Sequence, residues 1–304
     1  MCRCGVLEAR LSRRGIASLK AGRTSSILGS DTTSSAFVSV ALNTLLKEIG
    51  SASFFLNTIV VGLDAVETGH EKPAGLDISW DPRDRVVAAR MARKFAVESC
   101  MVRCAESLKV YIQSISKLPR FSELQGKWAA QEKANKKPGA AAKLEDIAKS
   151  LLEDSDPLIA AGMLLLIWRN NIVHDGDLSF PHHRKQTLLK NKLEISANYR
   201  NLDVDLLLDH ARAQKPTLKD VSCLIAMTIN LARAIDRKVH DNLGEEDLIA
   251  TLSILGLDKS IARIKRETTP ESVAASIKRC IESEAPGLYP TFENLLGPDG
   301  SRLN

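Results

Sequence analysis

Residues 158–173 are apolar on nearly every side, and this constrains the fold more than any other feature of the chain. A surface helix shows a single apolar stripe, whereas a helix without a polar face must be buried among other elements. Asp156 is a favourable N-cap residue, and Pro157 suits the first helical position. Gly176 is a natural residue to follow the end of such a helix. The sequence therefore predicts a buried central helix with other helices packed around it.

The rest of the chain also favours helices. No stretch alternates convincingly between apolar and polar residues, and β-branched runs are sparse, so we expect almost no sheet. Gly50 is expected to separate two short apolar helices, and residues 69–84 are expected to form a loop. The predicted fold class is therefore all-α, with helices over residues 37–49, 53–68, 85–118, 121–135, 140–153, 158–173, 182–200, 203–213, 217–242, 245–255, 259–265 and 270–283.

The net charge of +5 arises entirely in the N-terminal tail. Residues 1–25 contain six basic residues and one acidic residue, so the rest of the chain is balanced. Overall charge therefore does not argue for a nucleic-acid partner, and local patches must do so. The tail lacks a continuous apolar region, so we predict no secretory signal. Its basic, Ser-rich composition fits a disordered arm, although an organelle transit peptide has a similar composition.

Cys100 and Cys104 are the only closely spaced cysteine pair on a predicted helix. No second pair completes a zinc site, so we expect reduced thiols and no bound metal. The apolar stretches 53–63 and 160–168 are too short to span a bilayer by themselves. We therefore expect a cytoplasmic protein with no membrane contact.

Arg169, Asn170 and His174 lie at the end of the predicted central helix. They supply a fixed cation, an amide and a group that exchanges protons near neutral pH, which together suit a phosphodiester. Asn170 and His174 share a helix face because they are four residues apart. Arg169 and His174 are separated by about 140° on an ideal helix. We expect Arg169 to reach round the helix, or the last turn to loosen near Gly176.

This pattern, with Val173 before the histidine and Gly176 after it, resembles the R-x4-6-H motif of the HEPN superfamily. Its members are all-helical domains that are often metal-independent ribonucleases. A bare match is weak, and Arg233 with His240 provides a second one. Only the Arg169 match has an apolar helix before it, an Asn after the arginine and a Gly after the histidine.

The resemblance implies a HEPN-type helical bundle with additional N- and C-terminal helices. It covers residues 80–243. The predicted divisions are a disordered basic tail at 1–30, an N-terminal helical extension at 31–79, the HEPN-like domain at 80–243 and a C-terminal helical extension at 244–304.

The resemblance also implies a reaction in which an RNA 2′-OH attacks its own 3′ phosphate. His174 would transfer a proton, Arg169 would stabilise the phosphorane charge, and Asn170 would orient a phosphate oxygen or the histidine. The reaction needs an acid and a base, whereas one motif supplies one histidine. We therefore expect a two-fold homodimer whose motifs meet, with no metal and no cofactor.

Two departures from the family pattern matter. Gly176 stands where members paired with nucleotidyltransferase antitoxins usually carry Tyr. Apolar residues stand where some members have Glu and Lys before the motif arginine. Any accessory acid must therefore come from elsewhere, and Glu98 on the first long helix is the predicted one.

Residues 182–200 form a basic segment just beyond the motif. We predict that it binds RNA phosphates flanking the cut, and the alternative is an ordinary solvated helix face. Trp168 is expected to pack in the core rather than to stack on a base. The predicted RNA-binding residues are Arg184, Lys185, Lys190 and Lys192.

These features lead to the hypothesis of a HEPN-type endoribonuclease that acts in bacterial defence or as a toxin. RNA would be its substrate, and an antitoxin or regulatory protein a further partner. The alternative is a catalytically inactive HEPN-like module for dimerisation or for binding RNA or another protein.

Overall fold

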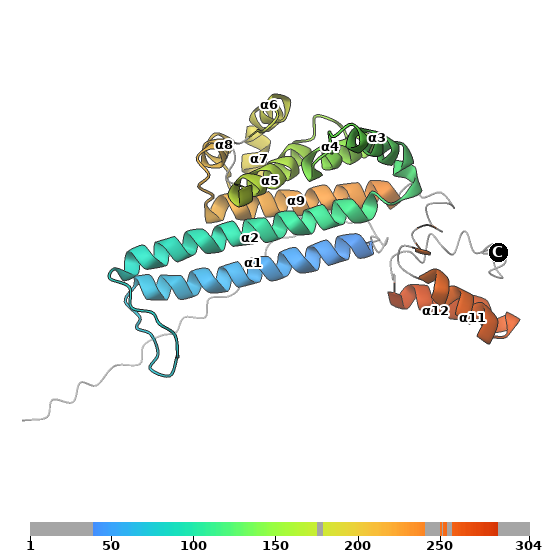
Figure 1. Cartoon of the computed structure of the whole chain (residues 1–304), viewed down its shortest axis with the longest axis horizontal. Helices are drawn as coiled ribbons and strands as arrows, with labels where there is room; N and C mark the ends of the chain where they lie inside the picture. The colour runs from blue at the N-terminus through green and yellow to red at the C-terminus, as the bar shows by residue number, and fades with distance from the viewer. Residues whose placement is uncertain (1–38, 175–178, 241–249, 251, 254–256, 285–304) are drawn as a thin grey trace, which may run out of the picture. The chain divides into compact units, whose positions relative to one another are not determined.

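The computed structural model describes residues 39–174, 179–240, 250, 252–253 and 257–284, which form helices and connecting turns without a β-strand (Figure 1). The predicted all-α fold class is confirmed. The elements are α1 (Val40–Glu67), α2 (Arg85–Ile115), the 3-10 turn η1 (Pro119–Phe121), α3 (Ser122–Lys133), α4 (Ala140–Leu151), α5 (Pro157–His174), α6 (His182–Lys190), α7 (Lys192–Asn198), α8 (Val204–Arg212), α9 (Leu218–His240), α11 (Leu257–Glu267) and α12 (Pro270–Glu284).

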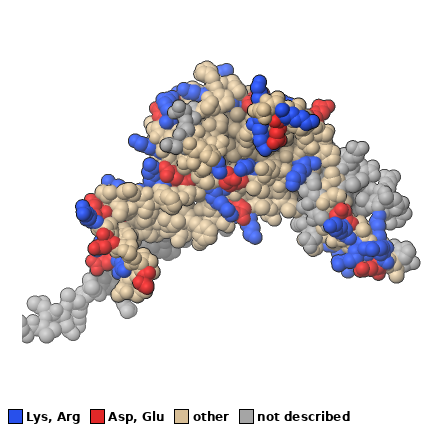
Figure 2. All heavy atoms as spheres, viewed as in Figure 1, with Lys and Arg blue, Asp and Glu red and all other residues tan. Residues whose placement is uncertain are grey.

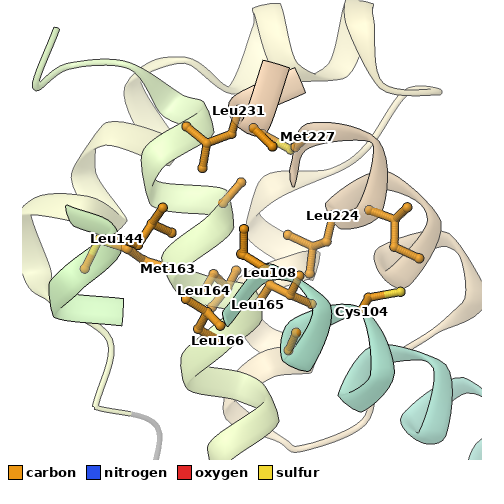
Figure 3. Close-up of a cluster of buried hydrophobic side chains, with 14 of the residues drawn as sticks. Cys104, Leu108, Leu144, Met163, Leu164, Leu165, Leu166, Leu224, Met227 and Leu231 are labelled. Atoms are coloured by element: carbon orange, nitrogen blue, oxygen red, sulfur yellow. The ribbon is translucent and has the colours of Figure 1, made fainter. Parts of the chain in front are cut away.

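Helix α5 is the buried centre of the bundle, as predicted. It packs against α2, α4, α6 and α9. Nine of its residues, from Ile159 to Trp168, are buried. Asp156 caps its start, because the Asp156 carboxylate accepts a hydrogen bond from the Leu158 amide at 2.8 Å. Figure 3 shows how Leu164 and Leu165 of α5 meet Leu108 of α2 and Leu224 of α9.

The helices around α5 are also tied by polar contacts to backbone carbonyls. The Tyr111 hydroxyl on α2 donates to the Ala232 carbonyl of α9 at 3.0 Å, and burial raises the pKa of this phenol. Arg120 donates to the Val239 carbonyl at 2.6 Å. These bonds hold the C-terminal end of α2 and the turn that follows it against α9.

Helix α1 runs unbroken through Gly50, so the prediction of two helices separated there is wrong. A glycine costs a helix only about 1 kcal/mol, and burial of one face of α1 outweighs that cost. Leu42, Leu45 and Ile49 belong to the same core cluster as the central helices. Residues 40–67, expected to form part of a separate extension, therefore contribute to the main core.

The continuity of α1 also changes the estimate of its apolar length. As one helix of 28 residues, α1 is long and apolar enough to cross a membrane by length and composition. Of its apolar 18-residue stretch, 17% is buried. The apolar stretch 53–63 is therefore only part of a longer apolar helix, Val40–Glu67. Among the described residues, length and composition alone make α1 a candidate span.

The remaining helices follow the predicted pattern with shifted ends. The basic segment 182–200 forms two short helices, α6 and α7, that meet at Asn191 rather than one helix. Thr217 caps α9 as expected, since its hydroxyl accepts from the Asp220 amide at 3.2 Å. Helices α11 and α12 pack on each other, and Ile261 of α11 and Ile277 of α12 are both buried. The predicted tail 1–30, Gly176 and most of the predicted helix 245–255 lie outside the described residues.

We expect opposite effects from adding a methyl group at two helical glycines. A Cβ at Gly50 meets nothing within 4 Å, so Gly50→Ala should stabilise the protein by roughly 0.5–1 kcal/mol. A Cβ at Gly162 would lie 2.7 Å from Leu231 Cδ2 and 3.0 Å from Leu144 Cδ2, both buried. Gly162→Ala should therefore destabilise by about 1 kcal/mol. Denaturant unfolding of the two variants measures this, and equal stabilisation by both would contradict the close packing at Gly162.

Candidate functional site

The last two turns of α5 are where this apolar helix first carries polar side chains. Trp168 is fully buried, consistent with the predicted core role, and Arg169 follows it directly. The Arg169 side chain is 18% exposed, and its Nη2 atom lies 2.6 Å from the Glu106 carboxylate on α2. Its Nη1 atom donates to Asn170 Oδ1 at 3.1 Å. Two partners therefore fix the direction of the guanidinium group at the edge of the core.

Glu106 is the acidic side chain at this site, and the sequence interpretation missed it. One oxygen of Glu106 faces Arg169, and the other lies 3.3 Å from Lys109 Nζ, one turn along α2. The predicted accessory acid, Glu98, instead pairs with Lys94 at 3.7 Å. Glu98 and Glu106 both lie on the side of α2 that carries Val102, so the sequence pattern alone does not separate them. The register of α5 against α2 determines that Arg169 pairs with Glu106 and not with Glu98.

His174 is exposed and ends α5 as the structure describes it. No described residue hydrogen-bonds to its ring. Asn170, one turn earlier, is also exposed. Because α5 remains helical through His174, the last turn does not loosen before the histidine, and about 140° separates it from Arg169. Within one chain, Arg169 points toward α2 while His174 faces solvent.

The local charge at this site favours an anion. Among the described residues, Arg169 and Lys109 share the single carboxylate of Glu106, which leaves one positive charge in excess before His174 is counted. Ion pairs at partly exposed positions contribute only about 0–1 kcal/mol, so a phosphate can replace Glu106 as a partner of the arginine. The arrangement suits capture of one phosphodiester beside a group that can exchange protons.

Arg184 does not belong to a phosphate-binding surface, and that prediction is wrong. Its side chain is completely buried beneath α6, although it lies in a basic segment. Its Nε atom donates to the Glu145 carboxylate at 3.0 Å, and its Nη2 atom lies 2.5 Å from Asp154. A buried guanidinium is stable only with such partners, so Arg184 links α6 to the middle of α4 and to the turn that follows α4.

Glu145 shows the strength of this buried network. Burial alone would raise its pKa, but hydrogen bonds from His183, Lys149 and Arg184 lower it to about 2. A carboxyl whose folded-state pKa lies below its unfolded value stabilises the fold above the unfolded value, here near 4.5. This contribution is lost as the pH falls from about 4.5 toward 2. The network therefore supports the fold at neutral pH.

The other predicted RNA-binding lysines remain on or near the surface. Lys190 and Lys192 are exposed and Lys185 is half-buried. Lys192 lies 3.3 Å from the Asp205 carboxylate, so its charge is partly neutralised. The structure brings none of these three lysines into a described contact with Arg169, Asn170 or His174. Without Arg184, this segment offers a weaker phosphate-binding surface than its sequence predicts.

The geometry must carry the functional argument by itself. Comparison of the chain with protein-family models, curated proteins and solved structures finds no match. In the part of the chain that the structure describes, no three His, Cys, Asp or Glu side chains gather as metal ligands would. The cysteines among those residues are free thiols.

We predict that Arg184→Met destabilises the protein by about 3 kcal/mol, because it leaves the Glu145 carboxylate without its buried partner. Lys190→Met, on the same helix but exposed, should change stability by less than about 0.5 kcal/mol. Denaturant unfolding at neutral pH measures both values. Similar stabilities for the two variants would show that Arg184 is not the structural link described above.

Proposed function

We propose that this protein is a metal-independent endoribonuclease of the HEPN type, cleaving RNA by attack of the 2′-OH on the adjacent phosphate. One observation carries the proposal. Arg169 is held in a defined orientation at the rim of a buried helix, and the exposed His174 lies just beyond it on the same helix. Arg169 would stabilise charge on the phosphorane, His174 would transfer protons, and Asn170 would orient the phosphate.

Glu106 has a positioning role in this proposal. Its carboxylate holds the guanidinium of Arg169 from α2 before substrate binds. A phosphate entering the site would compete for the same guanidinium edge, and Lys109 would then remain beside Glu106 to balance its charge. This supplies the accessory acid that was expected from Glu98.

We further propose that the active site is completed by a second copy of the chain. One site contains a single histidine, and Arg169 and His174 point in different directions on α5. A mainly apolar stripe on α2 supports a dimer, because Met91 and Phe95 are 69% and 71% exposed and lie in line with Val102. Glu98 is the charged residue within this stripe, and it pairs with Lys94. Burying this stripe against its symmetry mate would bring two Arg169 sites toward one axis.

The biological setting is proposed only in outline. A cytoplasmic ribonuclease with a defence or toxin role fits a site that needs no cofactor and acts on any accessible RNA. Such an activity requires restraint, so an antitoxin or other regulatory protein is the expected partner.

A second function is favoured by a specific observation. Arg169 already has an anionic partner in Glu106, and an arginine satisfied in this way also suits a purely structural role. The chain would then be a HEPN-like module that dimerises or binds RNA or a protein without cleaving it. The two functions differ in whether His174 is needed for activity.

We expect purified protein to cleave single-stranded RNA in EDTA and to leave 2′,3′-cyclic phosphate ends. His174→Ala and Arg169→Ala should each reduce the rate by roughly 10²–10⁴-fold. Arg233→Ala removes an exposed arginine of α9 from the second motif match and should cleave like the wild type. Equal rates for His174→Ala and Arg233→Ala would exclude the catalytic role of His174.

The dimer makes a separate prediction. Phe95→Glu places a charge in the apolar stripe of α2 and should convert a dimer to a monomer, with loss of RNA cleavage. Phe54→Glu alters a side chain on α1 that is 66% exposed and outside this stripe, and should leave both properties intact. Light scattering measures the mass in solution. A monomeric wild type that cleaves RNA would contradict the composite site.

A further inference from the structure

A shallow hollow at the far end of α2 combines free lysines with a rigid frame. It measures about 490 Å³ and lies between the end of α2, α3 and α4. The Gln125 amide donates to the Ser116 carbonyl at 2.8 Å, which ties α3 to the end of α2. Trp128 Nε1 donates to Asp146 at 2.7 Å, which ties α3 to α4. The walls of the hollow are therefore set by contacts within the fold.

Two lysines line this hollow, and neither forms an ion pair with a carboxylate among the residues that the structure describes. Lys143 lies over the Trp128 ring, with its Nζ atom 5.0 Å from the ring centre, and Lys117 is exposed. Glu132, which also lines the hollow, pairs with Lys137 at 2.8 Å, and Asp146 pairs with Lys127 at 2.8 Å. The positive charges of Lys117 and Lys143 therefore remain available to an anion.

The surroundings of the hollow are basic as well. Residues 117–149 contain eight basic and four acidic residues, a local excess that the neutral balance of the folded chain conceals. Figure 2 shows Lys and Arg side chains over α3 and the neighbouring end of α4, with Asp and Glu side chains among them. Lys133 and Lys136 lie in the sequence between Glu132 and Pro138, which line the hollow. Both lysines are exposed and form no ion pair among the described residues. Such a field favours an extended polyanion over a single small anion.

One face of α2 connects this hollow to the candidate site. Glu106, Lys109 and Gln113 follow one another at helical spacing, and Lys117 lies two residues past the end of α2 at Ile115; Gln113 and Lys117 are exposed. Glu106 precedes Ile115 by nine residues, a distance of about 14 Å along the helix. A strand bound in the hollow can therefore run along α2 toward Arg169.

A larger hollow elsewhere has the wrong charge for this role. It measures about 680 Å³ and is lined by Glu153, Asp156 and Glu194, with Lys238 as its basic residue. Phosphates would be repelled there. The contrast selects the α2–α3–α4 hollow as the surface for a polyanion.

We propose that the hollow holding Lys117 and Lys143 binds the phosphate backbone of single-stranded RNA and guides it along α2 to Arg169. The second half of this proposal rests on the proposed ribonuclease function, whereas binding in the hollow does not. The contacts are to phosphates, so affinity is independent of base sequence.

The test uses the full chain carrying His174→Ala, with binding of a fluorescein-labelled polyuridylate measured by anisotropy over a range of salt concentrations. Lys117→Gln with Lys143→Gln should weaken binding and reduce the slope of log affinity against log salt by roughly 1.4, for two phosphate contacts. The matched control neutralises Lys47 and Lys215, which are exposed on α1 and between α8 and α9, and should leave the slope unchanged. Lys133→Gln with Lys136→Gln provides a second variant that leaves the Trp128 contact intact.

Each outcome decides one point. Equal slopes for the hollow variants and the control, or no RNA binding by the parent chain, would overturn the hollow as an RNA site. Equal competition by poly-glutamate would assign the surface to an acidic protein instead. If RNA binding depends on the two lysines but the wild type never cleaves, the hollow stands and the ribonuclease function fails. If the wild type cleaves RNA but the hollow variants bind it normally, the ribonuclease function stands and the hollow is not an RNA site.

Discussion

Burial of α5 on all sides is the constraint on which the rest of the structure depends. Main-chain groups in the interior of a helix bond to one another, so the apolar side chains of α5 can be surrounded by α2, α4, α6 and α9. Polar chemistry is then excluded from its length and confined to its ends. Asp156 caps the first turn, and Arg169, Asn170 and His174 occupy the last two. The place of the candidate site follows directly from the burial of the helix.

Two arginines show how burial separates structural from functional charge. Arg184 is removed from water and needs two carboxylates and a backbone carbonyl, which leave it no capacity for a further anion. Arg169 has one carboxylate, shared with Lys109, and retains an exposed edge. Only the second arrangement allows exchange of a protein carboxylate for a phosphate. The difference lies in the neighbours that α4 and α2 provide, not in the arginines.

The sequence predicted the helices well because their signals are local. The Asp156–Pro157 start, the Thr217 cap and the apolar α5 are patterns of adjacent residues. Gly50 was misleading because helix breaking is a weak local preference that packing of α1 overrides. Glu106 and Arg184 could not be predicted, since each depends on the register between helices distant in the chain. A basic segment looks the same in sequence whether its arginine faces water or Glu145.

The outward face of α2 changes from apolar to charged and polar side chains along its length. This change determines from which side RNA would reach the proposed site. Met91, Phe95 and Val102 are apolar with Glu98 among them, Glu106 and Lys109 are charged, and Gln113 is polar. Lys117 follows the end of α2 and lines the basic hollow. A partner copy covering the apolar part would close one side of the Arg169 site to nucleic acid. RNA would then enter only from the Lys117 end, because phosphates gain nothing from an apolar surface. A two-fold axis would place the two hollows on opposite sides of a shared centre, so one strand could be held from both directions at the scissile phosphate.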